Sequence, residues 1–200
     1  MNILHIESSI FAENGVSSQL SRTLLEKLTL ENPGSEIRHK HFGQEPVPHF
    51  DGETLQALMQ DPDSRSGEQK DKVAYADQQI ADVQWADVIV IGLPMYNFSV
   101  PSMLKAWFDF IARAGVTFRY TEKGPEGLLL NKKVHILATR GGQYKDTPID
   151  TQIPFVKTFL NFLGITDINV IYAEGLNMGD DLKTLAIADA ENQIQQLQSA

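Results

Sequence analysis

The stretch Asp87–Leu93, which reads DVIVIGL, is the strongest indication of the fold in this sequence. Its centre, Val88–Ile91, is an unbroken run of β-branched residues, which favour strands. A strand that is apolar throughout, without polar alternation, is typical of a parallel sheet whose two faces are both covered by helices. The stretch therefore predicts an inner strand of an α/β protein.

Similar apolar segments recur on both sides of this strand, with helical patterns between them. The further predicted strands are Asn2–Glu7, Glu36–Phe42 (weak and charged, as suits a sheet edge), Lys133–Thr139 and Asp167–Ala173. The predicted helices are Ser17–Glu31, Glu68–Val83, Pro101–Arg113, Pro148–Leu163 (closed by Gly164) and Asp180–Gln198. Residues 43–67 read as irregular with one short helix at Glu53–Gln60, and Val116–Tyr120 as a small strand in an excursion that ends near Leu130. The alternation predicts a five-stranded parallel sheet with helices on both faces, in a single domain over residues 1–200.

Composition narrows the classes of function. The 200 residues carry a net charge of −9, which disfavours nucleic-acid or anionic-membrane partners. The chain has no cysteine, so disulfides, thiolate nucleophiles and Cys-bound metals are excluded. Residues 1–10 lack a signal-peptide pattern, and the longest uncharged run, between Asp87 and Lys105, is broken by Gly and Pro. We expect a cytoplasmic protein whose redox group, if it has one, is borrowed.

In such a sheet, ligands bind beyond the carboxyl ends of the strands. The loop after the first strand reads SSIFAENGVSSQ over residues 8–19 and leads into a helix. Free N–H groups at a helix N-terminus, together with serine hydroxyls, suit a phosphate, although serine is also a common helix cap. The first Lys or Arg is Arg22, so neutral donors would hold the group while Glu7 and Glu13 lie nearby. Because GxGxxG and P-loop motifs are absent from this loop, a monophosphate fits better than a dinucleotide or a nucleoside triphosphate.

Two more loops follow buried strands. PMYNFSVPS at residues 94–102 places large apolar side chains at the sheet rim, either to cover the core or to form a wall for a flat ring. TRGGQY at residues 139–144 has two glycines that permit close backbone approach to a ligand, or that simply form a turn. Three such loops at one edge of the sheet favour a single shared ligand.

Other candidate sites are weaker. His39 and His41 form an HxH pair that we interpret as a solvated edge strand, and His5 and His135 as packed core residues, so no metal site is predicted. The helix Pro101–Arg113 is apolar almost all round apart from its stripe of Lys105, Asp109 and Arg113. It is either buried in its own domain or packed against a second subunit.

At these residues the chain resembles a known family. ESS at residues 7–9, PMYNFSVPSMLKAWFDFIARAGVTFRYTEKGPEGL at 94–128, TRGG at 139–142 and FLNFLGI at 159–165 are similar to the bacterial FMN-dependent NADH:quinone oxidoreductases, or azoreductases. The resemblance implies a flavodoxin-like homodimer with one non-covalent FMN per subunit and active sites at the subunit interface.

Carried over residue by residue, the resemblance implies three groups of cofactor contacts. Ser9, Gly15, Val16 and Ser17 would hold the phosphate; Met95, Tyr96, Asn97 and Phe98 would flank the ring system; Thr139, Arg140, Gly141 and Gly142 would meet its other polar edge. Tyr120, Phe162 and Tyr172 match aromatic positions of the substrate slot. Family members often have a hydroxyl residue where Gly15 stands, so here only the backbone N–H could make that contact, and often Phe where Tyr172 stands.

The implied activity is electron transfer from NADH, with NADPH as an alternative donor, to quinones and aromatic azo compounds, with the two substrates taking turns. No side chain is assigned as catalytic, since the flavin carries the chemistry. The main alternative is a flavodoxin-type electron carrier without a substrate of its own. A response-regulator receiver domain is disfavoured, because the strand 87–93 ends in Gly92-Leu93-Pro94 without an acidic residue.

Overall fold

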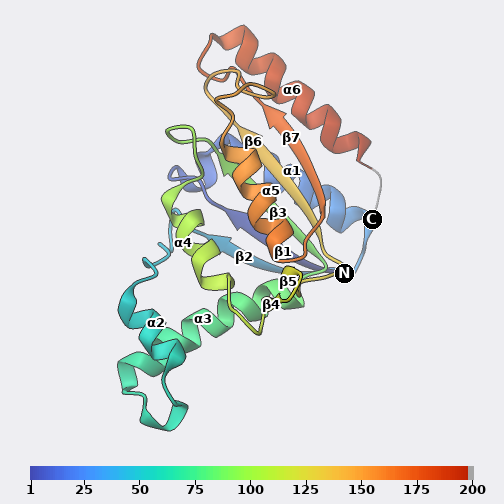
Figure 1. The fold of residues 1–200 in the computed structure, drawn as a ribbon. Coiled ribbons are helices and arrows are strands. Elements are labelled where there is room, and N and C mark those ends of the chain that lie inside the picture. Colours follow the sequence, from blue (N-terminus) through green and yellow to red (C-terminus); the bar gives the residue numbers. More distant parts are fainter. Residues whose placement is uncertain (198–200) are drawn as a thin grey trace.

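A five-stranded parallel sheet forms the centre of the computed structural model, which describes residues 1–197 (Figure 1). The strands are β1 (Asn2–Glu7), β2 (Glu36–His41), β3 (Val88–Pro94), β6 (Lys133–Thr139) and β7 (Asp167–Ala173), in the order β2-β1-β3-β6-β7. After β1 the chain adds β2 on one side of it and then β3, β6 and β7 on its other side. The boundary between β1 and β3 is therefore the switch point of a doubly wound fold. The predicted flavodoxin-like architecture is confirmed, including the charged strand at one edge.

Helices cover both faces of the sheet. One face packs α1 (Val16–Glu31) and α6 (Asp180–Gln196), and the other packs α3 (Gly67–Trp85), α4 (Ser102–Ile111) and α5 (Gln152–Phe162) (Figure 1). α2 (Gly52–Met59) packs on α3 at the periphery. Strand β3 is buried at all seven positions: Val88 and Val90 face one helix layer while Ile89 and Ile91 face the other. This two-sided burial is why DVIVIGL shows no polar alternation.

Several boundaries differ from the sequence prediction. α5 begins at Gln152 and not at Pro148, and the residues before it form turns. The excursion after α4 is a hairpin of β4 (Phe118–Thr121) and β5 (Gly124–Gly127), and single turns of 3₁₀ helix occupy Ala12–Asn14 and Pro62–Ser64. Gln198, the predicted end of the last helix, lies outside the described residues.

The apolar surface of α4 is used within the chain. Leu104, Trp107, Phe108, Phe110 and Ile111 are buried against the sheet and neighbouring helices. The solvent side carries Lys105, which is paired with Asp109. Of the two interpretations of this helix, burial in its own domain is therefore correct for these side chains.

The described residues include no helix with both the length and the apolar character needed to cross a membrane. Within residues 1–197, no three His, Asp or Glu side chains are grouped so that they could hold a metal ion.

Candidate functional site

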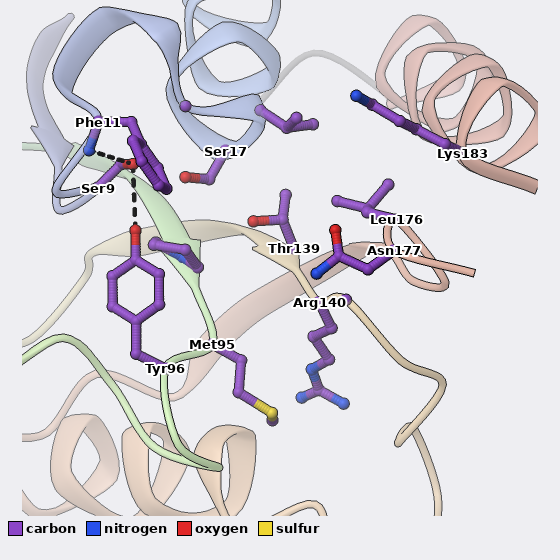
Figure 2. A pocket seen from close by; sticks show the side chains of 14 residues that line it. Ser9, Phe11, Ser17, Met95, Tyr96, Thr139, Arg140, Leu176, Asn177 and Lys183 are labelled. Carbon is purple, nitrogen blue, oxygen red and sulfur yellow. Dashed lines mark hydrogen bonds between the residues drawn. The ribbon is translucent and has the colours of Figure 1, made fainter. Parts of the chain in front are cut away.

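Two adjoining pockets open where β1, β3 and β6 end. The first has a volume of about 250 Å³ and is drawn in Figure 2; the second has a volume of about 480 Å³ and shares Met95, Gly141 and Asn177 with the first. Between them the pockets are lined by every residue expected to contact the cofactor, namely Ser9, Gly15, Val16, Ser17, Met95, Tyr96, Asn97, Phe98, Thr139, Arg140, Gly141 and Gly142. The fold thus brings the three loops, which are far apart in the sequence, to one place.

Hydrogen-bond donors at the start of α1, on one side of the pocket, have no acceptor among the described residues. α1 begins after Gly15 with no side-chain cap and no acidic residue in its first turn, so its first N–H groups have no partner within the helix. The Ser17 side chain is 1% exposed, and its hydroxyl has no hydrogen-bond partner among the described residues. Buried polar atoms are rarely left without a partner. A helix N-terminus and an unpartnered hydroxyl at one pocket wall suit an anion.

Gly15 is required by the packing of this loop. A Cβ at this position would lie 2.3 Å from the Ser9 Oγ atom and 2.7 Å from the Ser9 Cβ atom. Ser9 is itself held in place, because its Oγ accepts a hydrogen bond from the Phe11 N–H at 3.1 Å and lies 3.3 Å from the Tyr96 hydroxyl. In this structure the Gly15 N–H donates to the Ala12 carbonyl at 3.2 Å, so it is engaged within its own loop.

Glu7, at the end of β1 directly before this loop, is neutralised inside the protein. Glu7 is 1% exposed, accepts two hydrogen bonds from Arg22 at 2.6 and 2.9 Å, and lies 3.1 Å from His41. Burial opposes ionisation of Glu7, but the hydrogen bonds from Arg22 and His41 outweigh it and lower the pKa of the carboxyl. His5 lies beside this pair, and burial lowers its pKa to about 4. Glu7 therefore presents little repulsion to an anion in the pocket.

The second loop is a tight turn held from outside. Asn97 and Phe98 both have positive φ, 49° and 64°, between the paired backbone groups of Tyr96 and Ser99. This conformation is unfavourable for Phe, and non-glycine residues there cost about 1–3 kcal/mol each. Gln152 offsets the cost: its side-chain amide donates to the carbonyls of Pro94 at 2.9 Å and Ser99 at 3.2 Å. The turn leaves the Phe98 ring 50% exposed at the pocket.

The third loop is fixed by a buried ionic cluster. The Arg140 side chain is fully buried and donates two hydrogen bonds to Asp150, at 2.8 and 2.9 Å, and one to Glu174 at 3.0 Å. Glu174 also accepts the N–H groups of Tyr144 and Lys145 at 2.8 and 2.9 Å. With its guanidinium committed to these carboxylates, Arg140 can face the pocket only through its backbone.

The glycines of this loop are needed for close packing. A Cβ on Gly141 would lie 2.5 Å from the Asn177 amide, and one on Gly142 would lie 2.6 Å from the Tyr144 hydroxyl. Side chains at either position would displace neighbours or fill the pocket, so the GG pair keeps the pocket floor open.

The three residues expected in a substrate slot do not line these pockets. Tyr120 lies on the β4–β5 hairpin and is 75% exposed, and Phe162 packs against Phe118 at the end of α5 with ring centroids 4.4 Å apart. Figure 1 places β4 and β5 near the chain N-terminus, at the edge of the sheet opposite the carboxyl ends. Tyr172 lies in β7 under Arg140, with the guanidinium carbon 5.1 Å from its ring centroid.

The pocket also contains residues that sequence reasoning missed. Leu176 and Asn177 follow β7, Lys183 lies in α6, and Phe11 belongs to the first loop (Figure 2). The rule about carboxyl ends of strands, extended to β7, would have pointed to residues 174–179. No local pattern marks Lys183, because its place depends on how α6 packs beside α1.

Comparison with known proteins places this architecture in a family. Residues 1–197 match the family described as having a flavodoxin-like fold. A Cellvibrio japonicus protein named FMN-dependent NADH:quinone oxidoreductase is 52% identical over 194 residues, which span 97% of this chain and 96% of the relative. A protein of the same name from Alcanivorax borkumensis is 48% identical, over 97% of this chain and 98% of its own.

This chain belongs to that family. The crystal structure of azoreductase AzrA agrees with it in shape as well, with a TM-score of 0.87, 26% identity and coverage of 97% of both chains. Similarity of this extent over nearly the whole length means that the family's loops, and not only its sheet, are present here. The expectation drawn from the resemblance in the sequence is thus confirmed at the level of the family.

Proposed function

We propose that this protein binds FMN non-covalently in the pocket at the ends of β1, β3 and β6, and passes two electrons from NADH to quinones or aromatic azo compounds. The observation that carries the proposal is the buried, unpartnered Ser17 hydroxyl at the uncapped start of α1, at the switch point of the sheet. In sheets of this strand order, that is where a flavin phosphate binds.

The residues present fit such a cofactor. The α1 N-terminus and Ser17 would hold the phosphate, the turn Met95–Phe98 would flank the ring system, and the Gly141–Gly142 backbone would approach its polar edge. FMN, when bound, supplies the two-electron redox chemistry, and the protein supplies binding, orientation and exclusion of water. No side chain in the pocket is required to act as a nucleophile.

A homodimer would complete the active site. Phe11 and Phe98, 64% and 50% exposed, form an apolar rim at the pocket, and such rims are common at interfaces. Tyr120 and Phe162 lie away from the pocket in their own chain, so they reach a substrate slot only if a second copy supplies them. We therefore propose that the slot lies between two subunits, each a single FMN-binding domain. We also propose that the enzyme is cytoplasmic, where NADH is its electron donor.

Steady-state kinetics test the activity. The purified protein, reconstituted with FMN, should oxidise NADH when a benzoquinone or an azo dye is added, and initial rates should give parallel double-reciprocal lines because nicotinamide and acceptor share one slot. Bound FMN without NADH oxidation would instead identify an electron carrier. Intersecting lines would mean that both substrates bind together.

The variant Tyr120→Ala tests the shared slot. Because the side chain is 75% exposed, its loss should change the free energy of unfolding by less than about 0.5 kcal/mol. FMN affinity should persist, while kcat/KM for quinone falls at least severalfold.

Light scattering tests the proposed dimer. At micromolar concentration it should give a dimeric mass; a fully active monomer would contradict the interface.

A further inference from the structure

Lys183 places a positive charge at the pocket, near the wall that is formed by Ser17 and the start of α1. It lies near the start of α6, and Figure 2 shows its side chain extending from that helix with the amine toward the α1 wall that carries Ser17. Helices α1 and α6 pack against each other. This packing brings Lys183 close to residues 8–17, which we call the phosphate loop, although the two are far apart in the sequence.

The charge of Lys183 is not used elsewhere. Within the described residues, it forms no ion pair, although Asp180 and Asp181 lie in the first turn of the same helix. The other cation of the pocket, Arg140, is committed to Asp150 and Glu174. Arg22 is committed to Glu7. Of the two cations that line this pocket within residues 1–197, Arg140 and Lys183, only Lys183 has a charge that is available to a ligand.

The phosphate loop itself is short of donors for a dianion. Gly15 has no side chain, and its N–H is engaged with Ala12. Ser9 is held by Phe11 and Tyr96. Among the residues of this loop and of α1 that line the pocket, what remains is the Ser17 hydroxyl and the first N–H groups of α1, which are neutral. A dianion held by neutral donors gains a further charge–charge attraction from one nearby cation.

We propose that Lys183 is a phosphate-binding residue, which closes over the phosphomonoester of the flavin and makes this chain discriminate FMN from riboflavin. This inference rests on the proposed function, since it assumes that FMN is the ligand. It adds a cationic contact from α6 to a phosphate site that is otherwise built from α1 and its loop.

Flavin titration of the apoprotein tests the role without turnover. Binding is followed by quenching of flavin fluorescence, with FMN and riboflavin, for wild type, Lys183→Met, Lys183→Arg and a control, Lys70→Met. Lys70 is an exposed lysine of α3 that lines none of the pockets and forms no ion pair within residues 1–197, so its loss changes the net charge equally.

Lys183→Met should weaken FMN binding roughly five- to tenfold and leave riboflavin binding unchanged, as expected for one partly solvated charge pair. Its FMN affinity should also depend less on salt than that of wild type, because one screened attraction is lost. Lys183→Arg should retain most of the affinity, and Lys70→Met should match wild type.

Other outcomes overturn the proposal. Equal losses for FMN and riboflavin would mean that Lys183 only shapes the pocket. Unchanged FMN affinity together with a raised KM for NADPH but not NADH would assign the lysine to the nicotinamide donor. If the wild-type apoprotein bound neither flavin, the proposed function would fail, and the role of Lys183 with it.

Discussion

The buried cluster of Arg140, Asp150 and Glu174 gives the sharpest test of how the site is held. Replacing Arg140 by Met keeps a long side chain of similar shape but removes the charge and three hydrogen bonds. The side chains of Asp150 and Glu174, 8% and 15% exposed, would be left without their cation. Breaking a buried ion pair on one side costs about 3–5 kcal/mol, because the remaining charges stay desolvated.

Two features of the structure adjust this magnitude. The Nε atom of Arg140 has no partner among the described residues, so removing the guanidinium also relieves a desolvated group. Against this, Glu174 anchors the N–H groups of Tyr144 and Lys145, so its displacement would loosen residues 140–145. We expect a loss of about 3 kcal/mol, the lower end of the range for a buried pair. FMN affinity should fall too, since the Gly141–Gly142 floor loses its support.

The assay is urea unfolding of the apoprotein, followed by circular dichroism and by tryptophan fluorescence, to which buried Trp107 contributes. The matched control is Lys105→Met, which breaks the exposed pair with Asp109, 50% and 40% exposed, and should cost less than about 1 kcal/mol. Arg140→Lys should fall between the two, because a lysine cannot make the two-pronged contact with Asp150. If Arg140→Met destabilised the protein no more than Lys105→Met, the cluster would not be what fixes the loop.

Three further predictions concern Ser17, Gly15 and His135. Ser17→Asp should weaken FMN binding by more than about tenfold, because a charge-assisted hydrogen bond is worth about 1.5–3 kcal/mol and repulsion adds to its loss. The stability of the apoprotein should hold or rise, because an acidic group suits a helix N-terminus. Undiminished FMN affinity would show that the phosphate lies elsewhere. Gly15→Ala should cost about 1–3 kcal/mol in urea unfolding by crowding Ser9, and a neutral effect would mean that the loop adapts freely. Burial lowers the pKa of His135 from 6.5 to about 4, so the unfolded chain binds the extra proton first and stability is lost as pH falls from 6.5 toward 4, by about 1.4 kcal/mol per pH unit for this residue. His135→Leu should remove that part of the slope between pH 7 and 4.5; an unchanged slope would assign the pH dependence to other groups.

The five strands of the main sheet, most helices and the family could be predicted from the sequence alone. Unbroken β-branched runs such as Val88–Ile91 predict inner strands because burial on both faces leaves no place for polar alternation, and the structure bears this out. The polar edge strand was equally predictable. The start of α5 was not, because the helical pattern of residues 148–163 continues through a segment that tertiary contacts hold as turns, with Asp150 bound to Arg140.

The contacts that each site residue makes became clear only from the tertiary structure. The sequence places Arg140 in the right loop, but its side chain is held inside the protein by Asp150, 10 residues away, and by Glu174, 34 residues away. From the sequence, Gly15 is notable only because it lacks the hydroxyl that family members often have there. The fold shows that the Ser9 side chain occupies the space that a Cβ on Gly15 would need. Lys183 carries no local signal at all. Local patterns follow from the period and burial of one segment, whereas a pocket is formed by side chains whose proximity depends on how separate elements pack.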